Sequence, residues 1–338
     1  MSRHILILVL SALALSVTSL TAQQPQAELV SVEKIWDKAK HNGFTDITRF
    51  KNLFICAFRE GDDHIGGDGQ IRVLISSSGK TWVEQALVSE KGVDLRDPKL
   101  TIAPPEVLML TTGGSIYNGT RTLQGRQPRV ATSTDFKYWS PNVKALAAGD
   151  WLWRPAFNET DKKFYGVAYN QYPNTGGPKP EAEWSVKLYS SLDGKVWALT
   201  SVLNVTSLPS EATIRFKKDG TGVILMRRDG GDKRGALGVA APPYRDWKWT
   251  PLPYALAGPN FIVLPDDSMV ACTVAGTRLG LFKMTETALE PLLPLQSGGD
   301  CGYAGMVWED GQLHLTYHSS HEGKTSIYYA RVKLPWVK

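Results

Sequence analysis

Two short stretches carry charged or aromatic side chains in patterns that could bind a small molecule. Asp94-Leu-Arg-Asp-Pro98 alternates charges along an expected strand, so Arg96 or Asp97 would point toward a substrate. Trp151-Leu-Trp-Arg154 sets two indole rings beside a guanidinium, an arrangement that can stack on a sugar ring and donate hydrogen bonds to its oxygens. Each stretch also has a structural interpretation, in which an Arg–Asp pair joins neighbouring units and the tryptophans pack between them.

The histidines and cysteines form no metal-binding motif. His318-Ser-Ser-His321 lacks the i, i+4 spacing of a helical metal pair and has no third ligand. Cys56, Cys272 and Cys301 occur in no CxxC or Cys/His pattern. They leave two interpretations open, one disulfide with one thiol or three buried thiols. We therefore expect neither a bound metal nor a cofactor.

A short turn motif recurs along the chain and indicates the architecture that positions these residues. Its copies are Ser76–Trp82, Ser133–Trp139, Ser191–Trp197 and, less closely, Ala241–Trp247, with the tryptophans 50 to 58 residues apart. Ser and Asp side chains can accept hydrogen bonds from the backbone N–H groups of such a turn, Gly can take a positive φ, and Trp can pack the turn against its unit. A strand-rich repeat of about 40–50 residues is typical of β-propeller blades.

The expected fold is therefore an all-β propeller. Strand-length apolar runs and hairpins fill the chain from Phe44 onward, and only Val32–Lys40 is predicted to form a short helix. Division of the mature length by about 55 residues per repeat predicts six blades, with five or seven as alternatives. Such short blades must close into a ring to cover their edges, so residues 23–338 are expected to form one domain. The end of the central channel where the inner-strand loops meet is the expected ligand site.

Charge and the N-terminus limit the functional classes. The formal net charge is +5 and the basic residues are scattered, which argues against nucleic-acid binding. Met1–His4, followed by the apolar run Ile5–Leu20, is typical of a secretory signal peptide, here cleaved after Ala22; the alternative is an uncleaved anchor. No later segment is long and apolar enough to cross a bilayer. We expect a secreted or periplasmic monomer.

Three features resemble the sialidase superfamily. The repeated turns are similar to its Asp-boxes, or BNR repeats, which in true sialidases belong to six-bladed propellers. The segment Glu211–Arg227 resembles the sialidase hairpin in which a Glu precedes an Arg, and Gly302–Tyr317 resembles the segment that holds the catalytic Tyr. The resemblance extends over most of the chain after residue 22.

The resemblance implies a nucleophile, its base and a clamp for an acidic sugar. Tyr303 would attack the anomeric carbon and Glu211 would take its proton. A neutral phenol suits this attack because an anionic nucleophile would be repelled by a carboxylate on that carbon. Arg227 and, less closely, Arg278 match positions that bind the substrate carboxylate through paired N–H donors.

The sequence departs from the family at the first arginine of the clamp. Sialidases open with an Arg-Ile-Pro motif, and the corresponding stretch here is Gly43-Phe-Thr-Asp46. The next segment, Phe58–His64, is similar to the one that leads to the acid/base aspartate. It offers Asp62, Asp63 and His64, of which Asp63 or His64 is expected to take that role. The residues expected to line the pocket and bind substrate are Arg59, Arg96, Asp97, Arg154, Arg227 and Arg278.

The resemblance and this departure leave three functions open. The first is an exported exo-glycoside hydrolase that removes sialic acid or another, acidic or neutral, sugar from the end of a glycan. The second is a polysaccharide lyase on the same scaffold, in which a Tyr or His removes the proton beside a uronate carboxylate. The third is a non-catalytic propeller that binds a glycan or a protein.

Overall fold

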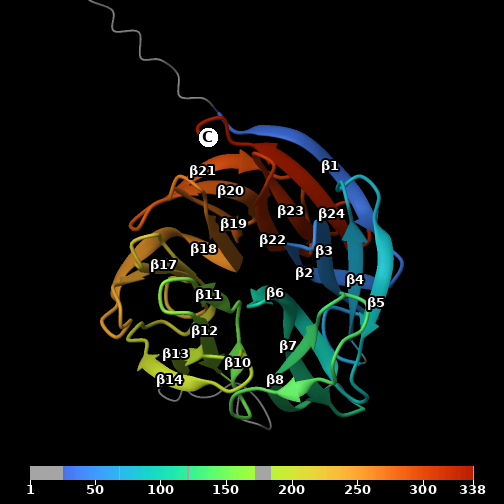
Figure 1. Cartoon of the computed structure of the whole chain (residues 1–338), viewed down its shortest axis with the longest axis horizontal. Helices are drawn as coiled ribbons and strands as arrows, with labels where there is room; N and C mark the ends of the chain where they lie inside the picture. The colour runs from blue at the N-terminus through green and yellow to red at the C-terminus, as the bar shows by residue number, and fades with distance from the viewer. Residues whose placement is uncertain (1–25, 68, 120–121, 172–183, 338) are drawn as a thin grey trace, which may run out of the picture.

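The computed structural model describes residues 26–67, 69–119, 122–171 and 184–337, and the expected signal peptide at residues 1–22 lies outside them. Within this part every regular element is a β-strand, and the strands form six blades around a common centre (Figure 1). The predicted all-β, six-bladed propeller is confirmed. No helix among these residues is long and apolar enough to span a bilayer.

The first three blades are separate antiparallel sheets. The first blade contains β2 (His41–Phe50), β3 (Leu53–Gly61), β4 (Gln70–Ser76) and β5 (Val83–Val88). The second contains β6 (Asp94–Ala103), β7 (Val107–Tyr117), β8 (Leu123–Ser133) and β9 (Val143–Lys144). The third contains β10 (Trp151–Leu152), β11 (Ala156–Asn158), β12 (Lys163–Asn170), β13 (Ser185–Ser191) and β14 (Ala198–Val202). In the third blade, β10 and β11 both pair with β12, so two short strands replace one inner strand.

The fourth and fifth blades share one long strand, β18 (Lys248–Val263). Its first half pairs with β17 and completes the fourth blade, whereas its second half pairs with β19 and begins the fifth. The other strands are β15 (Pro209–Phe216), β16 (Gly222–Arg228) and β17 (Arg234–Ala240) in the fourth blade, and β19 (Met269–Ala275), β20 (Arg278–Met284) and β21 (Leu289–Pro294) in the fifth.

The N-terminal strand closes the ring. The last blade contains β22 (Cys301–Glu309), β23 (Gln312–Ser319) and β24 (Ser326–Lys333), and β1 (Glu28–Trp36) pairs antiparallel with β24 as its outer strand. The helix predicted over Val32–Lys40 is therefore wrong. The backbone of β1 instead pairs with the hydrogen-bonding groups along the otherwise open edge of β24. Val32 and Trp36 pack in apolar clusters.

The repeated turns have one geometry in all four copies. In each, the Trp indole N–H donates a hydrogen bond to the carbonyl three residues earlier, at 3.0 to 3.2 Å. The residue that accepts it has a positive φ, whether it is Gly79 and Gly194 or the larger Phe136 and Tyr244. The tryptophan bond is thus common to all four turns, and glycine at the positive-φ position is not required.

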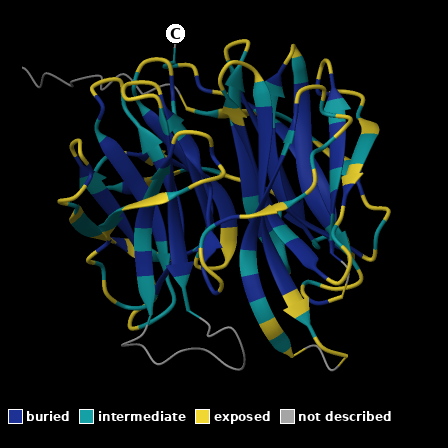
Figure 2. Cartoon of the chain, turned by 60° about the horizontal axis from the view of Figure 1, so that its bottom comes forward, coloured by how far each residue is buried: buried dark blue, intermediate teal, exposed yellow. Residues whose placement is uncertain are grey.

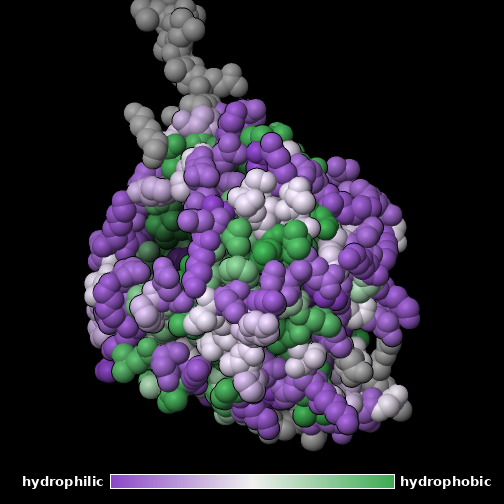
Figure 3. Space-filling view, turned by 45° about the vertical axis from the view of Figure 1, so that its right-hand side comes forward, coloured by the Kyte–Doolittle hydropathy of each residue, from purple (hydrophilic) through white to green (hydrophobic). Residues whose placement is uncertain are grey.

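Apolar side chains fill the spaces between blades, and the inner strands are almost entirely buried (Figure 2). One cluster joins the third and fourth blades and another joins the fifth and sixth. Cys56, Cys272 and Cys301 are free thiols, which settles the choice that the sequence left open. On the face in Figure 3, hydrophilic side chains surround separate small groups of apolar ones.

Candidate active site

Irregular strand pairing turns side chains toward one end of the channel. In β2, β6, β18 and β22, a register shift encloses one residue with positive φ, namely Phe44 (58°), Asp97 (53°), Gly258 (57°) and Tyr303 (50°). A further shift, in β15, contains Glu211. Bulges of this kind re-aim side chains, and a positive φ is uncommon for residues other than glycine. The five residues belong to five different blades, and the bulges bring them together.

Tyr303 and Glu211 form the central pair. The Tyr303 hydroxyl donates a hydrogen bond of 2.7 Å to Glu211 Oε1. The Glu211 side chain is buried, and its two oxygens also accept from Arg227 Nη1 at 3.1 Å and from the Gly258 N–H at 2.8 Å. Arg227 Nε donates in turn to Asp229 at 2.8 Å. These contacts fix the carboxylate against the phenol.

The charges around Tyr303 and Glu211 determine which of the two holds the proton that they share in the hydrogen bond. Burial, followed by the negative charge of Glu211 and then that of Asp97, raises the pKa of Tyr303 well above its ordinary value. Tyr303 is therefore a neutral phenol that donates to the Glu211 carboxylate. The charge of Glu211 also raises the pKa of Arg227, which stays cationic. A phenol in this state gains nucleophilic strength as its proton moves to the carboxylate.

Aromatic rings surround the Tyr303 ring. Phe44 meets it edge-on with centroids 4.9 Å apart, His318 stacks on it at 5.7 Å, and Trp153 lies at 6.0 Å. Phe44 belongs to the stretch Gly43–Asp46, in which the resemblance to sialidases led us to look for an arginine. The wall that it forms beside Tyr303 is apolar.

Arg96 and Asp97 lie beside this wall, together with Trp151. The Arg96 guanidinium is 5.0 Å from the Trp151 ring centre and 6.0 Å from that of Phe44, and its side chain is 16% exposed. Asp97 Oδ2 accepts the Trp151 indole N–H at 3.2 Å, whereas its buried Oδ1 has no hydrogen-bond partner among the described residues. A buried carboxylate oxygen without a partner is costly unless a ligand or water completes it.

Arg154, expected to bind substrate, has a structural position instead. Its guanidinium pairs with Asp46 and donates to the carbonyl of Ala304, the neighbour of Tyr303, and the side chains of Arg154 and Asp46 are 3% and 4% exposed. Asp46 also accepts the N–H of Leu100 from the next blade. The guanidinium is occupied because a buried charge needs a partner. Arg154 therefore supports the backbone at Tyr303.

A buried lysine lies in the same region. Lys99 is 1% exposed, and its ammonium is 4.5 Å from the Trp153 ring centre. Burial, and then the positive charge of Arg154, lower the pKa of Lys99 to about 8. Its ammonium donates a hydrogen bond to the carbonyl of Pro98 at 3.3 Å. This residue was not predicted from the sequence to belong to the site.

Arg59 and Asp63, expected in the pocket, build the loop after β3. Arg59 is fully buried and donates to Asp94 Oδ1 at 2.7 Å and to the carbonyls of Asp63 and Gly66 at 2.7 and 3.2 Å. The Asp63 carboxylate accepts the N–H of His64 at 2.8 Å within the same loop. The Arg59 guanidinium, which was expected to contact substrate, is thus held by three hydrogen bonds within the protein.

Arg278 lies outside the Tyr303 site. It is exposed at the start of β20 and lines a cavity of about 310 Å³ together with Tyr254, Phe282 and Pro291. The structure thus brings Tyr303, Glu211, Arg227, Arg96 and Asp97 together, and leaves Arg278 on the outer part of its blade.

His64 belongs to a cluster around Asp300. Its Nδ1 is 2.8 Å from Asp300 Oδ2, and Phe44 separates it from Tyr303, with ring centroids 4.9 Å from each. His318 contacts Asp300 as well, whereas His321 contacts the Ser319 hydroxyl at 2.9 Å.

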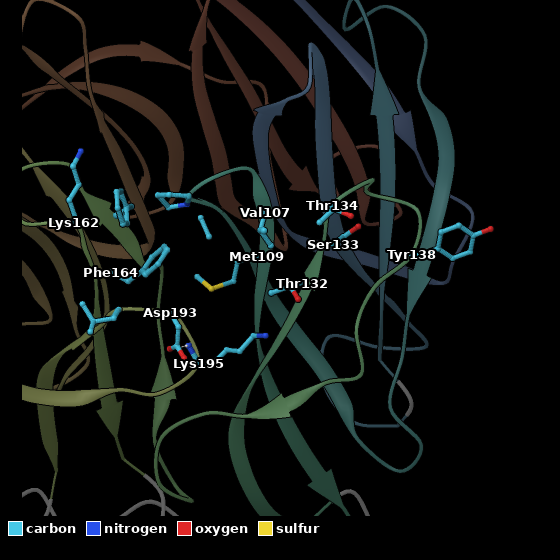
Figure 4. Close-up of a pocket in the computed structure, with 14 residues that line it drawn as sticks. Val107, Met109, Thr132, Ser133, Thr134, Tyr138, Lys162, Phe164, Asp193 and Lys195 are labelled. Atoms are coloured by element: carbon cyan, nitrogen blue, oxygen red, sulfur yellow. Dashed lines mark hydrogen bonds between the residues drawn. The ribbon is translucent and has the colours of Figure 1, made fainter.

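A separate cavity of about 700 Å³ lies between the second and third blades, at the repeated turns (Figure 4). Met109 and Phe164 form its apolar part, and Lys195 and Asp193 lie at its edge. The inner strands begin at the Tyr303 end of the channel, whereas these turns follow the third strand of each blade, so the cavity is on the opposite face. Its lining includes none of the residues predicted from the sequence to act in catalysis or to bind substrate.

Several residues of the site were missed by sequence reasoning. Phe44 and Asp46 were noted only as the stretch without an arginine, and His41, Gly258 and Asp300 were not considered. Asp300 lies before β22 and Gly258 lies within β18, and neither stands in a recognisable sequence motif. Their importance arises from contacts across 236 and 47 residues. Only the stretch Gly43–Asp46 carried a usable signal, through its alignment with a known motif.

Comparisons with known proteins support the architecture. No family model matches the sequence, and no curated protein matches it. Among solved structures, a protein of unknown function from Dyadobacter fermentans has a TM-score of 0.79 at 17% identity, covering 92% of this chain and 100% of its own. An α-L-arabinofuranosidase from Fusarium graminearum, in complex with an iminosugar inhibitor, has a TM-score of 0.71 at 14% identity, covering 91% and 99%.

A sialidase from Trypanosoma rangeli, captured as a covalent intermediate with 2,3-difluorosialic acid, has a TM-score of 0.66 at 12% identity. The match covers 87% of this chain and 54% of the sialidase chain, so this chain spans about half the length of that enzyme. At these identities the comparisons show the fold alone. The chain therefore has the propeller fold that is also found in these two glycoside hydrolases.

Proposed function

We propose that this protein is a retaining glycoside hydrolase that removes a sugar from the end of a glycan. The observation that carries the proposal is the 2.7 Å hydrogen bond from Tyr303 to the buried Glu211 carboxylate. A carboxylate that is fixed by Arg227 and Gly258 can accept the phenol proton without moving. The fold shared with an arabinofuranosidase and a sialidase adds support.

The reaction has two steps. First, Tyr303 Oη attacks the anomeric carbon, its proton passes to Glu211, and the glycosidic bond breaks as the leaving oxygen takes a proton from an acid. Then the base form of that acid removes a proton from water, water attacks the same carbon, and the bond to Tyr303 breaks as Glu211 returns the proton. The enzyme ends as it began, and the anomeric configuration is retained.

Asp97 is the carboxyl group that we assign as the acid. It follows Arg96, whose guanidinium is 6.0 Å from the centre of the Phe44 ring, and Phe44 in turn meets Tyr303 edge-on at 4.9 Å. Asp97 Oδ2 is held by Trp151 while Oδ1 is buried without a described partner. The latter oxygen would carry the proton to the leaving group.

The substrate that best fits the site is an acidic sugar. Arg227 and Arg96 are both partly accessible beside Tyr303, at 30% and 16% side-chain exposure. Paired guanidinium donors bind a carboxylate well. Because Phe44 and not an arginine forms the opposite wall and Arg278 lies elsewhere, Arg227 is the one member of the expected three-arginine clamp in the site, with Arg96 as a second cation, which favours a uronic acid or another small acidic sugar over sialic acid. Export through residues 1–22 is part of this proposal.

The test is turnover of a panel of aryl glycosides and acidic oligosaccharides, sialosides included, by protein that begins at Gln23. The proposal expects release of a terminal sugar with retained configuration, and a loss of about 10³-fold or more in folded Tyr303→Phe. Unsaturated products that absorb in the ultraviolet would indicate a lyase instead. Binding without turnover would indicate a non-catalytic propeller.

A further inference from the structure

Three side chains from distant parts of the chain point at one position beside the Tyr303 site. His41 Nε2 and His64 Nδ1 each lie 2.8 Å from Asp300 Oδ2. All three atoms are within 4.8 Å of one another, which is the spacing of ligands around a single ion. His41 and Asp300 are separated by 259 residues, so no sequence motif could have indicated the cluster.

A fourth side chain orients the carboxylate. His318 Nδ1 accepts the backbone N–H of Phe44 at 3.1 Å, so its Nε2 must carry the hydrogen. That Nε2 lies 3.2 Å from Asp300 Oδ1 and donates to it. One carboxylate oxygen is therefore held by His318, and the other is left facing His41 and His64. Ligands of metal sites are commonly oriented by an outer hydrogen bond of this kind.

An open metal site has ligands that are held in the protein interior and at least one side that solvent can reach. The three side chains show this pattern of exposure. The side chain of His41 is 8% exposed, whereas those of Asp300 and His64 are 31% and 46% exposed. An ion could enter from the His64 side and keep a position for water. Ligand atoms at about 2.1 Å around a tetrahedral ion lie about 3.4 Å apart, so the two 2.8 Å distances to Asp300 Oδ2 need to lengthen by about 0.6 Å.

We propose that His41, His64 and Asp300 bind one divalent transition metal ion, with Zn²⁺ as the expected occupant. Two imidazoles and one carboxylate suit zinc, whereas magnesium and calcium prefer oxygen ligands throughout. His41 belongs to β2, His64 to the loop after β3, and Asp300 to the segment before β22, so the ion joins the first blade to the last. The ion would therefore bridge the first and sixth blades where the ring closes, next to Phe44 and Tyr303.

The proposal is independent of the hydrolase activity and is tested by binding. Full-length mature protein without a polyhistidine tag, stripped with a chelator and dialysed, is titrated with Zn²⁺ by calorimetry and with Co²⁺ by absorption spectroscopy. We expect one equivalent to bind with a Kd in the micromolar range or below, a Co²⁺ spectrum of tetrahedral type, and a rise in Tm with added Zn²⁺. Failure to bind one equivalent would overturn the proposal.

Three variants and a matched control locate the site. His64→Gln is accessible and on a loop, so the fold should persist, and Asp300→Asn removes the shared carboxylate charge. Each should weaken Zn²⁺ binding about 100-fold or more, and His318→Gln about 10- to 100-fold. His321→Gln, which alters a nearby histidine outside the cluster, should bind as the parent does. Equal affinity in the parent and in His64→Gln would contradict the assignment.

Discussion

Tyr303 Oη and Glu211 Oε1 lie 2.7 Å apart although 92 residues separate them in the chain. Tyr303 enters this contact from a bulge in β22 and Glu211 from a bulge in β15, in the sixth and fourth blades. The backbone N–H of Gly258, from a third bulge in the fifth blade between them, holds the other carboxylate oxygen. The geometry of the pair therefore depends on three neighbouring inner strands.

Gly258 should be indispensable to this pair. A Cβ there would lie 2.8 Å from the backbone N of Tyr303, and the φ of 57° already disfavours other residues. Gly258→Ala should displace Tyr303 and lower kcat/KM about 10²-fold, since misplacement of about 1 Å has effects of this size. The control is Gly276→Ala, which has a similar φ of 67° but no atom within 4 Å of the added Cβ. Equal activity in both variants would show that the close approach at Gly258 has no catalytic consequence.

Arg227 should discriminate acidic from neutral substrates. Arg227→Lys keeps a positive charge near Glu211 but loses the planar pair of donors, so kcat/KM for an acidic sugar should fall about 10- to 100-fold. A neutral aryl glycoside should be affected much less. Arg228→Lys is the matched control, because Arg228 bonds Asp232 and the Arg234 carbonyl on the other face of the strand. Equal losses on both substrates would show that Arg227 acts through Glu211 alone.

Asp97→Asn should behave as the loss of a general acid. Turnover of a substrate with a poor leaving group should fall about 10²- to 10⁴-fold, because its departing oxygen needs a proton. A dinitrophenyl glycoside, whose leaving group needs none, should form the glycosyl-enzyme at nearly the parental rate, and azide should speed the second step. If both substrates lose activity equally, Asp97 has the substrate-binding role that the sequence predicts.

Lys99 should make stability depend on pH. Its pKa of about 8 is below the ordinary value of 10.5, so between these values the unfolded chain holds a proton that the folded chain lacks. Stability from this group therefore rises with pH across that window, by about 3 kcal/mol in total. Lys99→Met should be more stable than the parent at pH 7, and the difference should shrink by pH 9.5 in urea unfolding. A difference that is constant across this range would mean that Lys99 is not buried as a charge at pH 7.

The ring was predictable because its signals are local. Each repeated turn is determined by a few adjacent residues, and strand-length apolar runs separated by turn residues reveal the alternation of strands and turns. The N-terminal strand was mistaken for a helix because nothing in Val32–Lys40 reveals the open edge of β24, nearly 300 residues away. Only ring closure supplies the partner for that segment.

The site was predictable where a family motif marked its residues, and not where the role of a charged residue depends on a partner far away in the chain. Tyr303, Glu211 and Arg227 came from family resemblance, and the structure places them in contact. Arg59 and Arg154 were expected in the pocket from their positions. Arg59 instead forms an ion pair with the buried Asp94, and Arg154 forms one with the buried Asp46, each on another strand. The sequence shows a charge but not its partner, and that partner decides whether an arginine binds substrate or holds the scaffold.

The measurement that bears most directly on the mechanism is the mass of the trapped glycosyl-enzyme. The sugar that the parent turns over fastest would be supplied as its 2-fluoro glycosyl fluoride, or as 2,3-difluorosialic acid if a sialoside is preferred, and the protein digested and sequenced by mass spectrometry. Our account predicts one added glycosyl group on the Tyr303 side chain, absent from Tyr303→Phe and formed slowly by Glu211→Gln. A label on Glu211 or Asp97, or inversion of configuration in the product, would contradict it.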